Sequence, residues 1–182
     1  MAPEVGAPIW EGRAMSIYHW AATVLEPEAA KIHCEALSSG LPTFLAAGPY
    51  GRTALTPCVV EVFARAGRVS EALRELDDAL QFVEVTDERA WASELHRLRG
   101  ELLKKSDLAE AERAMTKALE VATAQGARSF ELRAAISLAR LRPGKKRSSA
   151  ALKELRRIHA SFTEGLETSD LLEAKALLDA GR

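Results

Sequence analysis

The sequence has few aromatic residues, no long apolar run and no excess of charge of either sign. Aromatic side chains make up 5% of its 182 residues, and Val, Ile, Thr and Tyr are too scattered to build a sheet. No stretch approaches the roughly 18 consecutive apolar residues that a membrane-spanning helix needs. The formal net charge of −1 creates no field that would attract nucleic acid or an anionic membrane. These features argue against a β-sheet protein, a membrane protein and a general binder of polyanions.

Cysteine is scarce too. Only Cys34 and Cys58 are present, they lack CxxC spacing, and residues 1–15 lack the basic and apolar regions of a secretory signal. We therefore expect two free thiols in a protein of the reducing cytoplasm. A structural zinc needs four ligands in a tetrahedron, and His33 together with these cysteines does not complete that set. The sequence thus predicts no metal site.

Motifs for phosphate binding and nucleophilic catalysis are absent. The chain has no GxGxxG loop, and PGKK at 143–146 lacks the first glycine and the Ser/Thr of a GxxxxGK[ST] loop. No GxSxG elbow presents a serine nucleophile, although a triad assembled in space leaves no local pattern. We expect neither enzymatic activity nor a cofactor.

Helix-forming residues dominate what remains. The apolar share of 47% and the charged share of 28% are typical of a folded protein. Ala, Leu, Glu and Arg lose little side-chain freedom in a helix, and the apolar positions recur at spacings of three and four. The sequence therefore predicts an all-α fold. Its expected helices are 15–25, 27–39, 54–66, 69–84, 88–104, 108–124, 128–141, 148–163 and a last helix from Asp170.

Several helix ends carry recognisable signals. Pro27 suits a first helical position, and Gly40 with Pro42 is expected to stop the helix that follows it. Asp107 precedes Glu110 by three residues, as an N-cap precedes the third helical residue. A glycine at 126 predicts a left-handed C-cap.

Three of the expected helices share one apolar pattern at an interval of 39–40 residues. Each carries four stripe positions at spacings of 4, 3 and 4, and the first position is always Ala. A recurring helix–turn–helix unit is the sequence mark of an α-solenoid, in which each unit buries its apolar face against the next. The equivalent sets are Ala72, Ala111 and Ala151; Leu76, Met115 and Leu155; Ala79, Ala118 and Ile158; and Val83, Ala122 and Phe162.

These stripes predict three regions along the chain. Residues 1–14 are expected to be a flexible arm, because they hold two Pro and two Gly without periodicity. Residues 15–52 are expected to form a degenerate N-terminal helix pair. Residues 53–182 are expected to form the repeats and a C-terminal capping helix.

The paired helices resemble the tetratricopeptide repeat, in which Gly or Ala in the first helix faces an Ala, large apolar, Ala pattern in the second. The period here exceeds the standard 34 residues, and the usual Pro at the repeat end is missing. Four strings are similar to the C-terminal tetratricopeptide-like region of large bacterial proteins that join a class III cyclase or a winged-helix regulator to a predicted ATPase. The strings are GRVSEALRELDDAL at 67–80, ELHRLRGELL at 94–103, ARSFELRAAISLARL at 127–141 and FTEGLETSDLLEAKALLD at 162–179.

The resemblance implies a right-handed superhelix and a docking or sensing role, since this chain carries neither the cyclase nor the ATPase domain. In tetratricopeptide arrays the first helix of each pair lines a concave groove that holds extended peptides. A spacing of 3, 4 and 3 places four charged residues of 88–104 on one helix face. The expected partner-binding residues are Glu94, Arg97, Glu101, Lys104, Glu131 and Leu138.

Alternatives remain open for these charged residues. The charges from Glu94 to Lys104 also fit plain intrahelical ion pairs, and Glu94 with His96 fits an exposed helix surface. A basic group near the third repeat fits either an anion-binding patch or a solvated surface, and the scarcity of interleaved aromatics favours the solvated surface. Its members are Arg140, Arg142, Lys145, Lys146, Arg147, Arg156 and Arg157.

Together these patterns predict a non-catalytic scaffold that binds a protein or peptide partner. A nucleic-acid-associated regulatory accessory and a small-ligand sensor are the alternatives. A homodimer is a further possibility if the N-terminal helix pair leaves an apolar edge exposed.

Overall fold

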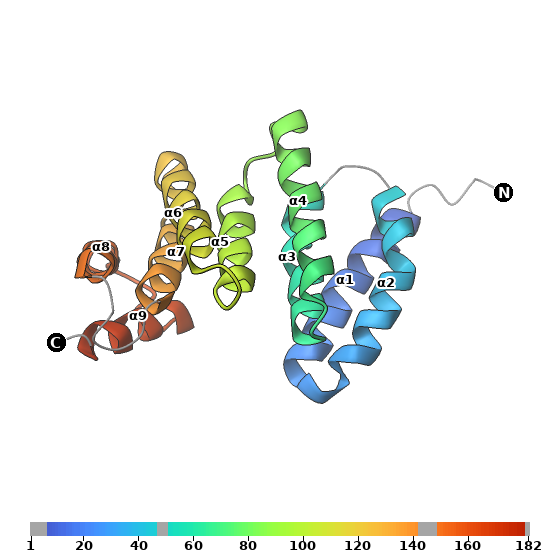
Figure 1. Cartoon of the computed structure of the whole chain (residues 1–182), viewed down its shortest axis with the longest axis horizontal. Helices are drawn as coiled ribbons and strands as arrows, with labels where there is room; N and C mark the ends of the chain where they lie inside the picture. The colour runs from blue at the N-terminus through green and yellow to red at the C-terminus, as the bar shows by residue number, and fades with distance from the viewer. Residues whose placement is uncertain (1–6, 47–50, 142–148, 181–182) are drawn as a thin grey trace. The chain divides into compact units, whose positions relative to one another are not determined.

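The computed structural model describes residues 7–46, 51–141 and 149–180, with backbone only at 7–9 and 41–46 (Figure 1). These residues form nine α-helices and one short 3-10 helix, and no strand occurs among them. The prediction of an all-α fold is confirmed. No helix within the described ranges is both long and apolar enough to cross a membrane. The chain divides into two compact units, Met1–Trp91 and Ala92–Arg182.

Unit 1 is built from four helices and a 3-10 turn. They are α1 (Ala7–Leu25), the turn Pro27–Ala29, α2 (Ala30–Ala46), α3 (Arg52–Arg65) and α4 (Val69–Thr86). Helix α1 packs against α2 and α3, and α3 packs against both α2 and α4. Pro27 opens the 3-10 turn, as its fixed backbone angle predicts. The helix α1 begins at Ala7, so the expectation of a flexible arm up to residue 14 is wrong for residues 7–14.

The expectation that Gly40 and Pro42 stop the second helix is also wrong, because α2 continues to Ala46. Gly40 serves packing instead. A Cβ atom at this position would lie 2.5 Å from Cε of Met15, so the missing side chain lets α1 approach α2 closely. Sequence rules treat a glycine as a helix terminator, whereas this glycine lies inside α2 and contacts the flexible end of Met15.

Unit 2 contains five helices. They are α5 (Ala92–Leu103), α6 (Leu108–Gln125), α7 (Arg128–Leu141), α8 (Ser149–His159) and α9 (Ser169–Asp179). Helix α7 contacts the other four and forms the centre of the unit (Figure 1). Its small buried residues, including Ala135 and Ala139, leave room for these close neighbours. Larger side chains such as Leu155, Ile158 and Leu171 fill the core around it.

The helix ends of unit 2 follow the predicted caps. The carboxylate of Asp107 accepts a hydrogen bond from the Glu110 backbone N–H at 2.9 Å, which satisfies a donor at the start of α6. Gly126 adopts a φ of 64° at the end of the same helix, in the left-handed region that favours glycine. Both predictions are confirmed.

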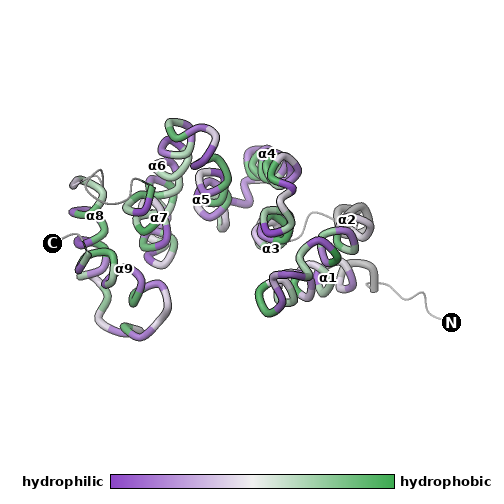
Figure 2. The backbone as a smooth tube through the Cα atoms, turned by 60° about the horizontal axis from the view of Figure 1, so that its bottom comes forward, coloured by the Kyte–Doolittle hydropathy of each residue, from purple (hydrophilic) through white to green (hydrophobic). Residues whose placement is uncertain are grey.

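The repeated stripe positions are buried as predicted. All four positions in α4 and all four in α6 are at most 3% exposed. In the third set, Leu155 and Ile158 are buried, Ala151 is half-buried, and Phe162 packs against the core from beyond the end of α8. Hydrophobic and hydrophilic stretches accordingly alternate along the helices (Figure 2).

Candidate functional site

A buried carboxylate marks the most organised polar site of unit 2. Glu94 lies in the first turn of α5 and is only 2% exposed. Burial of an ionised group is costly unless the charge is paired and hydrogen-bonded. Arg97 supplies both, because its Nε and Nη2 donate to the two Glu94 oxygens at 2.8 and 2.7 Å. The expectation that Glu94 lies on the helix surface is therefore wrong.

A second guanidinium reaches the same carboxylate from another helix. Nη2 of Arg133, on α7, lies 2.9 Å from Oε1 of Glu94. Nη1 of Arg97 also donates to the Ser137 hydroxyl of α7, at 3.4 Å. Two arginines thus share one buried acid, and these contacts connect α5 to α7.

The intrahelical ion pairs considered from the sequence are present. Arg97 lies 3.9 Å from Glu101, and Lys104 lies 2.7 Å from the same carboxylate. Burial acts to raise the pKa of Glu101. Hydrogen bonds from Lys104 and Ser137 and the nearby positive charges outweigh that effect, so the pKa lies below its ordinary value.

These side chains form one charge-balanced group, the Glu94 cluster. Arg133 extends it to α9, where Nε lies 3.9 Å from Asp170. Three acidic and three basic residues take part, so no net charge is left over to attract a simple ion. The members are Glu94, Arg97, Glu101, Lys104, Arg133, Ser137 and Asp170.

The exposure of the side chains increases from the inner to the outer members of the Glu94 cluster. The side chain of Arg97 is 12% exposed, whereas those of Arg133, Asp170 and Lys104 are 33%, 44% and 48% exposed. The inner members therefore hold the helices together, and the outer members remain open to an incoming group.

The structure separates the remaining predicted residues from this cluster. Glu131 is half-buried in the first turn of α7 and lies within electrostatic reach of Arg157 on α8. Leu138 is half-buried on the same helix. Four of the six predicted residues thus belong to the cluster, three of them on α5 and Lys104 directly after it.

Sequence reasoning missed Arg133 and Ser137, although the signal that identifies them was present. Glu94 and Arg133 are 39 residues apart, and Arg97 and Ser137 are 40 apart. The stripes of α6 and α8 are 40 residues apart, so Arg97 and Ser137 occupy equivalent positions on the first helices of consecutive helix pairs, and Arg133 lies one residue before the equivalent of Glu94. Extending the repeat alignment from apolar to polar positions would have paired Arg97 with Ser137 and placed Arg133 beside the position equivalent to Glu94.

No family model matches this chain, and no curated protein matches it. The resemblance to tetratricopeptide proteins therefore remains an interpretation of the sequence. The functional assignment depends on the residues and their geometry.

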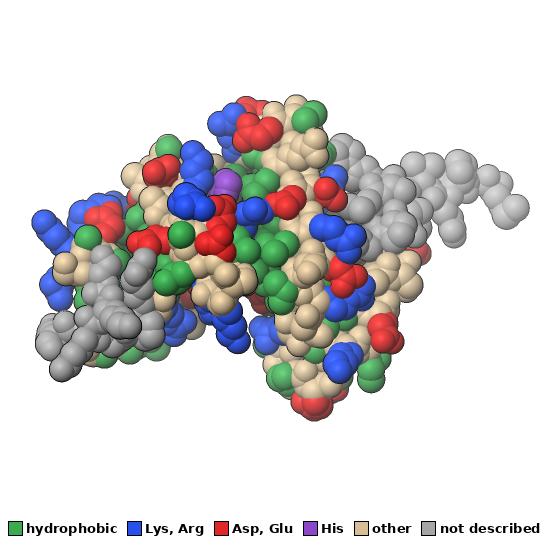
Figure 3. Space-filling model, viewed as in Figure 1, with side chains coloured by type: hydrophobic (Ala, Val, Ile, Leu, Met, Phe, Trp, Pro, Cys, Tyr) green, Lys and Arg blue, Asp and Glu red, His purple; other side chains and the backbone are tan. Residues whose placement is uncertain are grey.

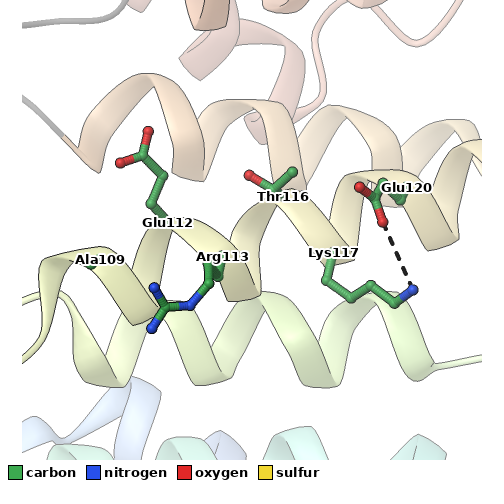
Figure 4. A pocket seen from close by; sticks show the side chains of 6 residues that line it. All are labelled: Ala109, Glu112, Arg113, Thr116, Lys117 and Glu120. Carbon is green, nitrogen blue, oxygen red and sulfur yellow. Dashed lines mark ion pairs between the residues drawn. The ribbon is translucent and has the colours of Figure 1, made fainter.

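An open pocket of about 530 Å³ lies on the outer face of α6 (Figure 4). All the residues that line it belong to this one helix. Lys117 and Glu120 form an ion pair at 3.8 Å within one turn, and both are more than half exposed. Such exposed pairs contribute little free energy, so this face is a solvated surface without a preorganised group. Its lining residues are Ala109, Glu112, Arg113, Thr116, Lys117 and Glu120.

The basic residues near the third repeat do not form an isolated patch where they are described. Arg140 pairs with Glu173 at 2.6 Å, and Arg157 pairs with Glu154 at 2.6 Å. Acidic and basic side chains are interspersed on the face shown in Figure 3. Residues 142–148 lie outside the described part of the chain, and with them Arg142, Lys145, Lys146 and Arg147.

Both cysteines of unit 1 are free thiols, as predicted. Cys34 is buried and accepts a contact from Arg68 at 3.4 Å, and burial raises the pKa of the Cys58 thiol. The imidazoles of His33 and His19 meet at 3.0 Å between their Nδ1 atoms. Among the described residues no group of three His, Cys, Asp or Glu side chains is placed to hold a metal ion.

Proposed function

We propose that this chain is a non-catalytic docking module of the tetratricopeptide-like α-solenoid type, and that unit 2 binds an extended protein segment along α5 and α7. The observation that carries the proposal is the Glu94 cluster. It connects the first helices of two consecutive helix pairs, α5 of the α5/α6 pair and α7 of the α7/α8 pair. In a repeat array, such first helices provide the partner-binding surface.

The graded exposure of the cluster supports this role. Its inner pair, Glu94 and Arg97, fixes the spacing of α5 and α7 before any partner arrives. Preorganised side chains lose less conformational freedom on binding, which favours affinity. The outer charges of Lys104, Arg133 and Asp170 then match a partner segment that carries both signs.

The cluster also disfavours simple anions. An isolated carboxylate or phosphate would have to displace Glu94, Glu101 or Asp170 from the basic groups, because acids and bases are balanced. A peptide offers backbone groups and mixed charges that add to the network instead. The resemblance in the sequence suggests that the partner belongs to a cyclase or ATPase signalling system.

A peptide-array experiment tests the proposal. The purified full chain is applied to an array of extended peptides, beside Lys104→Glu and Arg113→Glu proteins that retain the helical circular-dichroism spectrum of the parent. Lys104 is 48% exposed directly after the end of α5, and Arg113 is 67% exposed on the outer face of α6, so the second variant is a matched control.

We expect a set of peptides that the parent and Arg113→Glu bind and that Lys104→Glu loses. Binding that is equally retained by both variants, or the absence of any bound peptide, would contradict docking at α5 and α7. Retention of double-stranded DNA at low salt by the parent would favour a nucleic-acid accessory instead.

A further inference from the structure

In α1, the first helix of unit 1, small and polar residues face the core and large apolar residues face outward. Its buried stripe consists of small or polar residues, Gly12, Ser16, His19 and Thr23, at spacings of 4, 3 and 4. The buried hydroxyls are satisfied locally, since Ser16 donates to the Gly12 carbonyl at 3.0 Å and Thr23 donates to the Trp20 carbonyl at 2.8 Å. Among the described side chains of α1, the fully buried ones include no large apolar residue, although Met15 and Trp20 are half-buried.

Five large apolar residues of α1 face outward. Trp10, Ile17, Tyr18, Val24 and Leu25 are 67%, 49%, 63%, 44% and 80% exposed. From Ala14 to Leu25 the helix contains no Lys, Arg, Asp or Glu. A solvent-facing helix normally carries charges on its outer face, so this surface resembles the core of an interface, which is depleted in charge and rich in aromatic residues.

The outward residues follow the spacing of a helix-pairing seam. We call Trp10, Ala14, Ile17, Ala21 and Val24 the α1 stripe; their spacings are 4, 3, 4 and 3, as in coiled coils. Bulky and small side chains alternate along it. With a two-fold axis near residue 19, an antiparallel copy sets Ile17 against Ala21 and Val24 against Ala14, so each bulky residue meets a small one, and Trp10 lies beyond the paired segment. This self-complementarity is what a two-fold interface requires.

The exposed area suits such an interface. A fully presented aromatic side chain contributes roughly 150–250 Å², so the five large residues of α1 expose on the order of 600 Å². A standard interface buries about 800 Å² on each partner. A pocket of about 560 Å³ adjoins the stripe, where Ala54 and Leu55 of α3 lie beside Trp10 and Ile17. It adds apolar surface to receive a side chain of the second copy.

We propose that a second copy of this chain covers the α1 stripe, with the two α1 helices antiparallel about a two-fold axis. The interface belongs to unit 1 and does not depend on peptide docking by unit 2. Another apolar protein or a lipid surface would bury the same residues but would not require the alternation to be self-complementary.

Sedimentation over a range of protein concentrations tests the proposal on the full chain. We expect the parent to sediment as a dimer that dissociates on dilution. Ile17→Glu in the α1 stripe, and Leu25→Glu beside Val24 at its end, should each weaken self-association roughly tenfold. Leu25 is 80% exposed, so its substitution leaves the fold intact even if Ile17→Glu disturbs it. Val85→Glu, at a 79% exposed residue of α4, is the matched control and should remain dimeric.

Cross-linking tests the antiparallel arrangement. Mild oxidation of a mixture of Ala14→Cys and Val24→Cys proteins should trap a heterodimer faster than either protein alone forms a homodimer. Faster trapping within either single variant would contradict the antiparallel pairing.

A parent that remains monomeric at its highest soluble concentration would overturn the proposal. Binding of that monomer to lipid vesicles would then assign the stripe to a membrane surface. Dimers that persist in both Ile17→Glu and Leu25→Glu would also overturn it, because the contact would lie elsewhere.

Discussion

Helix α1 of unit 1 and helix α5 of unit 2 both bury polar side chains, but they satisfy them differently. In α1 the buried groups are uncharged hydroxyls that bond to their own helix, and His19 meets another imidazole. Helix α5 buries Ser93, which donates to the Ala118 carbonyl of α6, and the carboxylate of Glu94, which is held by two arginines from two helices. Because the buried hydroxyls of α1 bond within their own helix, its apolar residues can face outward. The ion pairs of Glu94 instead connect α5 to α7.

The largest expected effect comes from removing the buried acid. Glu94→Gln keeps the shape of the side chain but leaves Arg97 and Arg133 without their shared counter-ion. Breaking a buried ion pair on one side typically costs about 3–5 kcal/mol of unfolding free energy. Urea unfolding followed by far-UV circular dichroism measures the loss. Glu120→Gln, at a 63% exposed residue of α6, is the control and should change stability by less than about 0.5 kcal/mol. A loss below about 1 kcal/mol for Glu94→Gln would remove the distinction between the two helices.

Gly40 in unit 1 and Gly100 in unit 2 allow helix packing to be compared between the two units. A Cβ at Gly100 would lie 2.5 Å from Cγ of Met115 and 2.9 Å from the Ala111 carbonyl oxygen, which is backbone. At Gly40 the nearest atom is the flexible end of Met15. Gly100→Ala should therefore cost about 1–3 kcal/mol, and Gly40→Ala distinctly less. Equal losses in urea unfolding would show that both helix pairs adapt alike.

A smaller effect is expected at the start of α6. Asp107→Ala removes the side-chain acceptor for the Glu110 N–H and should cost about 1 kcal/mol, whereas Asp107→Ser keeps an acceptor and most of the stability. The two variants compared in thermal unfolding separate capping from general loss of charge. Equal destabilisation by Ala and Ser would contradict the capping role.

The smallest effect concerns pH and separates the units by their titratable groups. Burial and the neighbouring His33 lower the pKa of His19 below 6.5. The unfolded chain therefore binds the proton more tightly, so the His19 contribution to stability is complete above pH 6.5 and declines as the pH falls below it. The pKa of Glu101 lies below 4.5, so its contribution in unit 2 persists until the pH falls below 4.5.

Tryptophan fluorescence makes this difference measurable, because Trp10, Trp20 and Trp91 all lie in unit 1. Between pH 6.5 and 4.5 the urea midpoint by fluorescence should fall more than the midpoint by circular dichroism, which averages over the helices of both units. His19→Gln should abolish the larger fall of the fluorescence midpoint. A fluorescence midpoint that is constant over this range would show that protonation of His19 does not couple to folding.

The sequence predicted the features that depend on local chemistry and on the apolar period. The buried stripes from Ala72 to Ile158, the Asp107 cap and the Gly126 turn depend on residues near in sequence, and the structure confirms them. Features that depend on a neighbour from another helix were missed. The buried carboxylate of Glu94 is paired with Arg133 of α7, and Gly40 lies inside α2 against Met15 of α1. The sequence alone does not show which face of α1 is exposed, because an apolar stripe normally faces the core and this one faces outward.

Mapping a bound peptide onto the chain tests the central claim of docking at α5 and α7 most directly. Backbone amide shifts of the isotope-labelled full chain would be recorded by nuclear magnetic resonance with and without a peptide selected on the array. The account predicts that the largest changes fall on α5 and α7 around Lys104 and Arg133, with α6 around Arg113 nearly unchanged. Changes concentrated on the outer face of α6 or in unit 1 would contradict it.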